Sequence, residues 1–328
     1  MAALLEVKNL RIELITRDGV APVIDDLSFI LNAGETLSFV GESGCGNSMT
    51  ALALMGLLPE KVGRVASGSI IFKGENLVQA SNDRMRAIRG NDISMIFQEP
   101  MTSLNPVFTI GEQIAEVLRA HQALSRKAAW SQAIELLDAV RIPNAKGRVS
   151  DYPFQMSGGQ RQRAMIAMAL ACRPKILIAD EPTTALDVTV QAQIFDLLSD
   201  LRQQTGAAII LITHDMGAVA EMAERMIVMY AGRKAELGPV DQIIDRPRHP
   251  YTKGLIECVP HIQSDPRPER HDLVEVPGIV PSLREFGKDQ CLFASRCPYL
   301  TQTCLTSRPV AKQFENDQSA DCWHAEAL

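Results

Sequence analysis

The sequence is poor in aromatic residues, in long hydrophobic runs and in positive charge. Aromatic residues make up 5% of the 328 residues, and 33 Lys and Arg stand against 39 Asp and Glu, a net charge of -6. Because no run of about eighteen apolar residues is present, the sequence predicts no membrane-spanning segment. The absence of a basic excess argues against nucleic acid as a partner.

The first ten residues, MAALLEVKNL, also lack the pattern of a secretory signal, because they contain Glu6 and no long apolar core. We therefore expect a soluble chain that stays in the cytoplasm. Hydrophobic residues at 46% and charged residues at 22% are typical of a globular protein. The length allows one large α/β domain with an appendage.

Short apolar runs alternate with amphipathic segments over residues 1–240, which predicts an α/β domain whose helices cover a sheet. The predicted strands are Leu4–Val7, Arg11–Ile15, Thr36–Val40, Ser69–Phe72, Ile93–Phe97, Lys175–Ala179, Ala207–Ile212 and Met226–Met229. A helical insert is expected over about residues 100–172, with helices at Gly111–His121 and Lys127–Val140. Residues 241–328 are rich in Pro, Gly, His and Cys, which predicts a separate, irregular extension.

A glycine-rich segment, GESGCGNS, lies between the strand Thr36–Val40 and a helix-forming stretch. In the pattern G-x-x-x-x-G-K-[ST], glycines allow tight curvature, and backbone N–H groups at the helix start face phosphates. Ser48 would supply a hydroxyl to Mg²⁺. The candidates for nucleotide contact are Gly41, Glu42, Ser43, Gly44, Cys45, Gly46, Asn47, Ser48 and Met49.

Asn47 stands at the position where this pattern requires Lys. A Lys ammonium reaches the β- and γ-phosphates as a point charge, whereas the Asn amide is neutral and shorter. We therefore expect the chain's own phosphate site to be impaired. Taken alone, the segment fits an ordinary tight turn as well as it fits a phosphate loop.

Two further segments carry groups suited to phosphate chemistry. The apolar run ILIADE ends in Asp180 and Glu181, so that Asp180 could hold Mg²⁺ and Glu181 could orient and deprotonate a water. The segment FQMSGGQRQR places small residues at a helix start, where free N–H groups suit an anion. An ordinary polar turn and an ordinary glycine-rich helix cap are the alternatives.

In this order the segments resemble the ATP-binding subunits of ABC transporters, over nearly the whole chain. Gln98 matches the Q-loop glutamine, Ala185-Leu186-Asp187 the D-loop and His214 the switch histidine. The segment Ser157-Gly158-Gly159-Gln160 matches the LSGGQ motif, with Met156 in place of Leu. The resemblance implies a P-loop ABC-type α/β ATPase core with an antiparallel β subdomain, a helical insert and an irregular Cys-rich C-terminal extension.

The resemblance also implies roles for individual residues. Glu181, His214 and Gln98 would be catalytic, and Ser48, Gln98 and Asp180 would surround Mg²⁺. Two such chains would sandwich two ATP molecules, each held by the phosphate loop of one chain and by the signature segment of the other. The residues implied to contact nucleotide outside the phosphate loop are Asp180, Ser157, Gly158, Gly159, Gln160 and Asp187.

Within that superfamily the chain is similar to the oligopeptide, dipeptide and nickel importer branch. This similarity rests on the segments FQEPMTSLNP, RPRHPYT and VPGIVPSL and on a tail with Cys291, Cys297, Cys304 and Cys322. The resemblance implies a four-iron four-sulfur cluster on these cysteines, and four thiolates would also suit Zn²⁺. Four reduced structural cysteines are the alternative, because the spacing contains no C-x2-C pair.

The expected function is therefore that of an ATPase subunit, with Mg²⁺ and ATP, that energises peptide uptake across the inner membrane. Its expected partners are two permeases, a second ABC ATPase and an extracytoplasmic solute-binding protein, which would hold it at the cytoplasmic face as a peripheral protein. Nickel or another small solute is the alternative cargo. A non-hydrolysing regulatory subunit is the alternative role that Asn47 suggests. A soluble ABC ATPase of translation or DNA repair would require two cassettes or a long coiled coil, and neither is visible.

Overall fold

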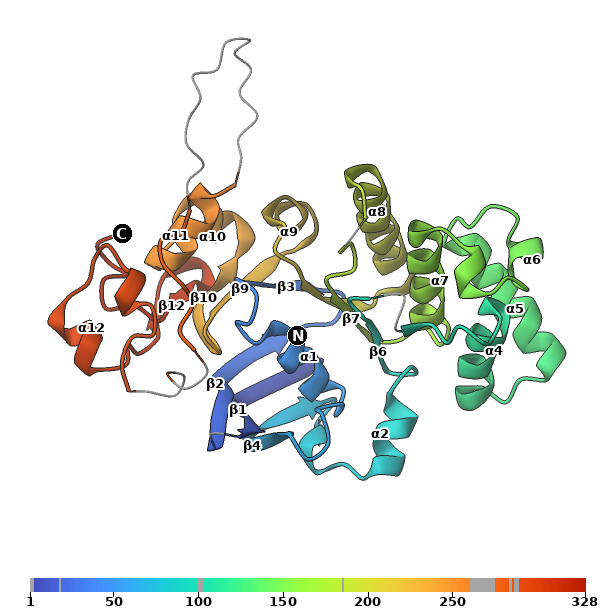
Figure 1. The fold of residues 1–328 in the computed structure, drawn as a ribbon, viewed down its shortest axis with the longest axis horizontal. Coiled ribbons are helices and arrows are strands. Elements are labelled where there is room, and N and C mark those ends of the chain that lie inside the picture. The colour runs from blue at the N-terminus through green and yellow to red at the C-terminus, as the bar shows by residue number, and fades with distance from the viewer. Residues whose placement is uncertain are drawn as a thin grey trace, which may run out of the picture.

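A computed structural model describes residues 3–17, 19–99, 103–184, 186–259, 275–282, 285 and 289–328. Two β-sheets, packed one over the other, organise this part of the chain (Figure 1). The smaller sheet is antiparallel, has the order β2-β1-β4-β5, and consists of β1 (Leu5–Thr16), β2 (Gly19–Leu31), β4 (Gly63–Phe72) and β5 (Glu75–Asn76).

The larger sheet has the order β11-β12-β10-β9-β3-β8-β7-β6. Its strands β9, β3, β8, β7 and β6 run parallel, and β10 pairs antiparallel with β9. The bounds are β3 (Thr36–Val40), β6 (Ile93–Ile96), β7 (Ile176–Asp180), β8 (Ala208–Ile212), β9 (Arg225–Tyr230), β10 (Arg233–Pro239), β11 (Lys312–Gln313) and β12 (Ser319–Ala320). The parallel order brings the carboxyl ends of β3, β7 and β8 to one edge.

Helices fill the layers around the sheets. Helix α1 (Asn47–Leu54) lies between the two sheets, and the predicted helical insert is confirmed beside β6 and β7 (Figure 1). The insert contains α4 (Ile110–His121), α5 (Arg126–Ala139), α6 (Ala145–Arg148) and α7 (Gly158–Leu170). The remaining helices are α2 (Asn82–Ile88), α8 (Val188–Thr205), α9 (Met216–Met222), α10 (Val240–Asp245), α11 (Pro250–Glu257) and α12 (Gln302–Thr306), with 3-10 turns at Leu77–Gln79, Pro153–Gln155, Ala294–Arg296 and Glu315–Asp317.

The central strands are buried on both faces, which explains their continuous apolar sequences. In β7, Ile176 and Ile178 pack toward α1 and the antiparallel sheet, whereas Leu177 and Ala179 pack toward the helical insert and α8. This alternation follows the two-residue period of a strand. The sheet is thus held from both sides, and its carboxyl edge has a fixed position.

The sequence prediction differs from the fold at several strands. Only the end of β4 was predicted, as Ser69–Phe72, and the two-residue strands β5, β11 and β12 were not predicted. The two predicted strands Leu4–Val7 and Arg11–Ile15 are one strand, β1, because Asn9 adopts a φ of 45° and forms a bulge that lets pairing continue. Strand β2 was not predicted, since Pro22 interrupts its pattern; Pro22 is tolerated because β2 lies at the sheet edge. Strand β10 was missed because its sequence, RKAELGP, is mostly polar.

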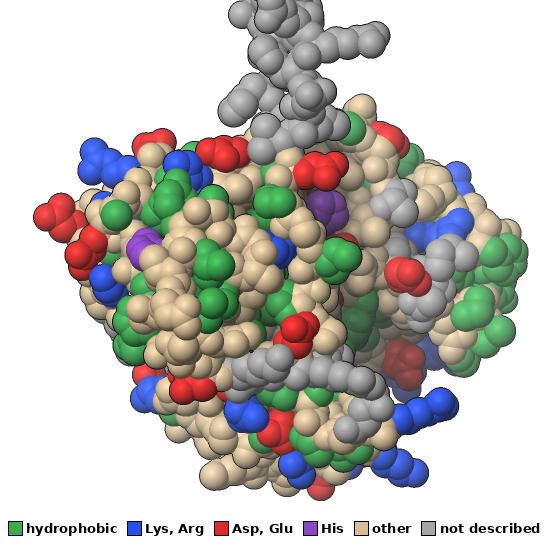
Figure 2. Space-filling view, turned by 60° about the vertical axis from the view of Figure 1, so that its left-hand side comes forward, with side chains coloured by type: hydrophobic (Ala, Val, Ile, Leu, Met, Phe, Trp, Pro, Cys, Tyr) green, Lys and Arg blue, Asp and Glu red, His purple; other side chains and the backbone are tan. Residues whose placement is uncertain are grey.

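The C-terminal extension packs on the larger sheet rather than away from it. Strand β12 pairs with β10, and an apolar cluster joins Tyr230 of β9 to Phe293 of the extension. Asp25 of β2 accepts bonds from Arg11, Arg233 and Arg308, so the extension is also tied to the antiparallel sheet. Figure 2 shows acidic and basic side chains interspersed over the face that carries the extension. None of the helices in the described ranges is long and apolar enough to cross a membrane.

Candidate active site

The glycine-rich loop connects the buried strand β3 to α1 and curves through left-handed backbone at Gly44 and Gly46, whose φ values are 84° and 103°. A Cβ on Gly46 would lie 2.4 Å from Ile24 Cδ1, and a Cβ on Gly41 would lie 2.3 Å from the Met229 carbonyl oxygen. Both positions therefore require glycine. No side chain caps the start of α1, which leaves its first N–H groups for an anion.

A cleft of about 310 Å³ opens over this loop. All nine predicted contact residues, from Gly41 to Met49, line it. The other lining residues are Leu14, Val23, Glu181, Ile212 and Thr213. The apolar side of the cleft is aliphatic, so a base bound there would meet Leu14 and Val23 rather than an aromatic ring.

Ser48 and Asp180 meet as the sequence predicts. The Ser48 hydroxyl donates to Asp180 Oδ1 over 3.0 Å, and Asp180 ends the buried strand β7. The pKa of Asp180 is raised to about 6, mainly by burial and also by the negative charge of Glu181, while the hydrogen bond from Ser48 acts in the lowering direction. A hydroxyl and a carboxylate are the hard oxygen ligands that Mg²⁺ prefers.

Glu181 is the centre of a second group of side chains. The Gln98 amide donates to Glu181 Oε2 over 2.7 Å, and the Thr184 hydroxyl donates to the same oxygen over 2.9 Å. His214 Nδ1 lies 3.8 Å from Glu181 Oε1. Glu181 itself has a φ of 44°, a strained conformation that is frequent at functional sites. The structure thus places Gln98 and His214 against Glu181.

Asn47 occupies the first position of α1 and is buried at 9% exposure. Its Oδ1 atom is buried and has no hydrogen-bond partner. An amide is neutral, so this side chain lacks the charge that a Lys would bring to the cleft.

The signature residues lie away from this cleft. Ser157 caps α7: its Oγ accepts from the Gln160 N–H over 3.3 Å, and Gln160 Oε1 accepts from the Ser157 N–H over 3.1 Å. Gly158 and Gly159 face Leu186 and Val190 at the start of α8. Asp187 caps α8 by accepting from the Val190 N–H over 3.0 Å. Ala185, of the predicted D-loop, is outside the described residues.

Two residues of the C-terminal region reach the phosphate loop, and the sequence did not indicate them. The Glu42 N–H donates to the Tyr251 hydroxyl over 2.8 Å, and Arg296 donates to both Glu42 carboxylate oxygens over 2.7 and 2.9 Å. These hydrogen bonds with Glu42 raise the pKa of Arg296 above its usual range. The partners are 209 and 254 residues apart in sequence, so no local pattern could reveal them.

The four tail cysteines, for which the resemblance implies a metal centre, lie in one region of the extension. Burial and the Cys291, Cys297 and Cys304 thiols raise the pKa of Cys322 to about 11. Cys304 Sγ lies 3.9 Å from His324 Nε2. Within the described ranges, no group of three or more His, Cys, Asp or Glu side chains is placed to hold a metal ion. The side-chain placement therefore does not support the predicted cluster.

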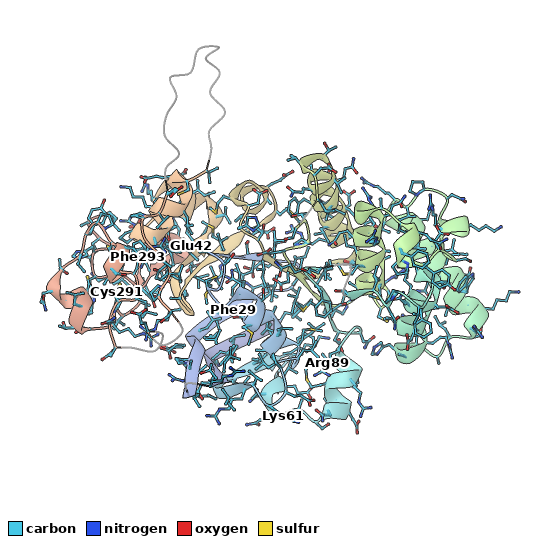
Figure 3. All side chains as sticks on the ribbon, viewed as in Figure 1. Phe29, Glu42, Lys61, Arg89, Cys291 and Phe293 are labelled. Carbon is cyan, nitrogen blue, oxygen red and sulfur yellow. The ribbon has the colours of Figure 1, made fainter. Side chains whose placement is uncertain are left out.

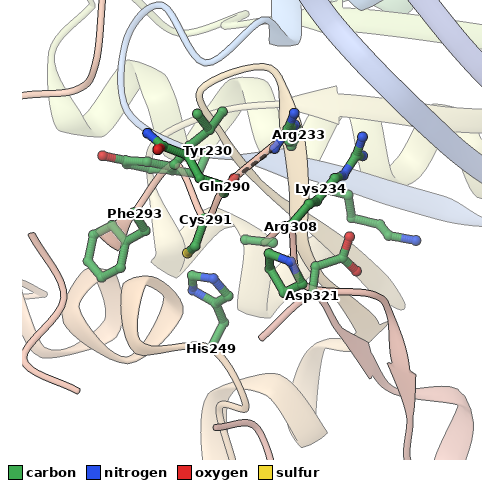
Figure 4. Close-up of a pocket in the computed structure, with 12 residues that line it drawn as sticks. Tyr230, Arg233, Lys234, His249, Gln290, Cys291, Phe293, Arg308 and Asp321 are labelled. Carbon is green, nitrogen blue, oxygen red and sulfur yellow. Dashed lines mark hydrogen bonds between the residues drawn. The ribbon is translucent and has the colours of Figure 1, made fainter. Parts of the chain in front are cut away.

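Cys291 instead borders a small cavity of about 30 Å³ between β10 and the extension. Figure 4 shows its thiol and the His249 ring pointing toward one another across this space. Burial lowers the pKa of His249 to about 4, so the ring is neutral at physiological pH. The same close-up shows Arg233 donating to the Gln290 carbonyl over 3.1 Å, which ties the cavity wall to β10.

This arrangement of a phosphate loop, a buried acidic strand end and a glutamine beside a glutamate defines an ATP-binding cassette. The ABC transporter family matches residues 24–184, and the oligopeptide/dipeptide transporter C-terminal region matches residues 235–304. The chain therefore belongs to the ABC transporter ATP-binding proteins that carry this C-terminal region.

The similarity to known relatives extends over the whole length. The chain is 50% identical to the oligopeptide transport ATP-binding protein OppD of Haemophilus influenzae, over 98% of each chain. It is 48% identical to y4tR of Sinorhizobium fredii, described as a probable peptide ABC transporter ATP-binding protein, over 98% of this chain and 95% of the relative.

Solved structures agree with the fold. The dimeric cassette MJ0796, bound to ADP and Pi in a post-hydrolysis state, matches with a TM-score of 0.64 and 27% identity, over 72% of this chain and 98% of that chain. The cbiO1 protein of Clostridium perfringens, part of the cbiONQ transporter complex, matches with a TM-score of 0.62 and 24% identity, over 75% of this chain and 92% of that chain. The predicted fold class, a P-loop ABC-type cassette with α/β layers and an antiparallel sheet, is confirmed.

Proposed function

We propose that the chain couples ATP hydrolysis to uptake of peptides across the inner membrane, from its cytoplasmic face. The observation that carries this is the meeting of the phosphate loop, Asp180 and Glu181 at one cleft, in a chain that resembles peptide-importer subunits at about half of all positions. Residues 1–240 would form the ATPase domain and residues 241–328 the extension typical of the peptide branch.

The residues of the cleft would have separate roles in Mg²⁺ binding, proton transfer and phosphate binding. Ser48 and Asp180 would hold Mg²⁺, which when bound neutralises charge on the β- and γ-phosphates. Glu181 would accept a proton from the attacking water, and Gln98 and His214 would keep its carboxylate and the water in line. The N–H groups of the loop and of α1 would cradle the phosphates.

The signature residues would act on the nucleotide of a second ATPase subunit. They lie at an accessible helix start beyond the chain's own cleft, where small residues leave room for a phosphate. The residues proposed for this contact are Ser157, Gly158, Gly159, Gln160 and Asp187. Because they do not depend on Asn47, the chain could complete a partner's site even if its own site turns over slowly.

Exposed apolar side chains support contact with permeases. Phe97, Val107 and Phe108 are 36%, 71% and 49% exposed, and Phe154 is 68% exposed and stacks on Tyr152 at 5.5 Å between ring centroids. Phe97, Val107 and Phe108 flank the segment from Gln98 to Pro106, of which residues 100–102 lie outside the described residues. Such exposure of large apolar groups marks an interaction surface.

Uptake measurements test this function. Cells that produce the chain with two permeases, a second ATPase subunit and a solute-binding protein are expected to accumulate a labelled tripeptide, and cells that lack only this chain are not. Labelled nickel is measured in parallel as the competing cargo. Nickel uptake without peptide uptake would replace the proposed cargo, and recovery of the chain in the soluble fraction beside its permeases would contradict membrane attachment.

We also propose, from the resemblance alone, that Cys291, Cys297, Cys304 and Cys322 hold a four-iron four-sulfur cluster or Zn²⁺. The Cys291 N–H donates to the Cys304 carbonyl over 2.9 Å, which already joins two of the four backbones. A thiolate-bound metal would stabilise a segment that has little apolar core of its own.

Anaerobically purified protein is expected to contain iron and labile sulfide, or zinc, and the Cys304→Ser variant is expected to lose it. Cys258→Ser, which alters a cysteine outside the four, is the matched control. If the unaltered chain contains neither iron nor zinc, the four residues are ordinary thiols.

A second candidate is a nucleotide-binding subunit without turnover. The neutral Asn47 side chain in place of Lys favours it, because the site then lacks its main phosphate cation. Turnover at the unaltered chain's own site separates the two candidates, because the first requires it and the second excludes it.

A further inference from the structure

Arg296 is a buried cation whose whole hydrogen-bonding capacity is directed at the phosphate loop and its surroundings. Its side chain is 2% exposed, and its guanidinium makes five donor contacts, the number that an arginine can offer. The acceptors are Glu42 Oε1, Glu42 Oε2, the Tyr230 hydroxyl and the carbonyls of Val276 and Pro277. These five hydrogen bonds hold the Arg296 side chain in a single position.

The acceptor that matters is Glu42, the second residue of the loop. Its N–H donates to the buried Tyr251 hydroxyl, and its carboxylate receives two bonds from Arg296, so both its backbone and its side chain are fixed from the C-terminal region. The ring of Tyr230 packs between Tyr251 and Phe293, with centroids at 4.6 and 5.1 Å. Figure 3 labels Glu42 in the same part of the molecule as Phe293 and Cys291 of the extension.

The Arg296–Glu42 pair affects ATP binding because the Glu42 carboxylate and the phosphates of ATP are both negatively charged. Glu42 lines the cleft that would take a triphosphate, and its carboxylate would repel the phosphates if it stood alone. Arg296 pairs that negative charge in a bidentate bond and at the same time prevents the carboxylate from turning into the cleft. The pair is partly shielded from water, since the Glu42 side chain is 31% exposed, so the effect is not lost to solvent screening.

We propose that Arg296 is a positioning residue for nucleotide binding: it neutralises Glu42 and fixes the first turn of the phosphate loop. The C-terminal extension is then part of the ATP site, although none of its described residues lines the cleft. Arg296 belongs to the turn Ala294–Arg296, which is bracketed by Cys291 and Cys297, so any event that moves these cysteines also moves the loop's anchor. The inference rests on nucleotide binding at this loop.

The test measures the Kd for MgATP of the full chain, with Asn47 unaltered and with Asn47→Lys. Arg296→Met is expected to raise the Kd at least about tenfold, the size expected for a partly buried charge left unpaired. Arg296→Lys should raise it less, since a single ammonium keeps the charge but not the two-point contact. Adding Glu42→Gln to Arg296→Met removes the unpaired charge and should recover most of the affinity.

Arg308→Met is the matched control. Arg308 belongs to the same extension and bonds to Asp25 and Asp26 of the antiparallel sheet instead of the loop. Both Arg→Met variants should lower Tm, and only Arg296→Met should change the Kd. A merely structural role would leave the double variant as weak as Arg296→Met.

Three results overturn the inference. Equal Kd values for the unaltered chain and Arg296→Met would remove it and leave the nucleotide site standing. Failure of Glu42→Gln to recover affinity would also remove it. Absence of MgATP binding both by the unaltered chain and by Asn47→Lys would overturn the proposed nucleotide site itself and the inference with it.

Discussion

Replacing Asn47 by Lys is expected to raise ATP turnover of the assembled transporter by at least about tenfold. The substitution restores a charge-assisted bond to phosphate, which is worth about 1.5 to 3 kcal/mol, and about 1.4 kcal/mol corresponds to tenfold in rate. The rest of the site can use that charge, because Ser48, Asp180, Gln98 and Glu181 are already in contact in pairs.

Steady-state phosphate release, measured for both chains in the same complex, checks this expectation. Asn82→Lys is the control, since it adds the same charge at an exposed position of α2. Equal rates for the unaltered chain and Asn47→Lys would mean that the lysine position is dispensable here. A large gain would show that the remaining groups of the site are competent once the charge is restored.

Glu181→Gln, made together with Asn47→Lys, is expected to lower hydrolysis by about 10² to 10⁴ while ATP still binds. The range is that of a general base in the transition state. A glutamine carbonyl can still accept the bonds from Gln98 and Thr184, but it cannot take a proton from water. The variant therefore changes the proton acceptor and leaves the cleft in place.

Phosphate release and MgATP binding are both measured for this variant. Glu135→Gln, at an exposed position of α5, removes the same charge far from the cleft and serves as the control. If Glu181→Gln hydrolyses ATP as fast as its parent, the proton acceptor is another group. If it loses ATP binding as well, Glu181 contributes to the binding site and not only to the chemical step.

Local patterns indicated the parts of the site that lie along one strand and its turn, and the resemblance of the whole set to ABC ATP-binding subunits favoured a phosphate site over ordinary turns. The buried strands β3, β7 and β8 have continuous apolar sequences, and the residues that follow them, such as Gly41 and Glu181, are fixed at the sheet edge once the strands are placed parallel. Ser48 and Asp180, both predicted to lie at a Mg²⁺ site, are within hydrogen-bond distance of each other.

The contacts that were missed depend on the packing of distant segments. Arg296 reaches Glu42 only because the extension folds back over β9, and neither residue carries a local sign of this pairing. Strand β2 was missed because Pro22 and the adjacent acids Asp25 and Asp26 break its alternation, although those acids are the ones that bind the arginines of β1, β10 and the extension. In β2, ion pairs with distant arginines stabilise a strand whose local sequence includes residues of low strand propensity.

The pairing of β12 with β10 can form only late in translation. Its Ala320 pairs with Glu236 of β10, so the outer edge of β10 acquires its partner only after a long stretch of later sequence has been translated. During that interval an open strand edge is available to other nascent chains, which is a route to aggregation. Slow translation of the segment between these strands should therefore lower the yield of folded protein, and a chaperone that covers strand edges should restore it.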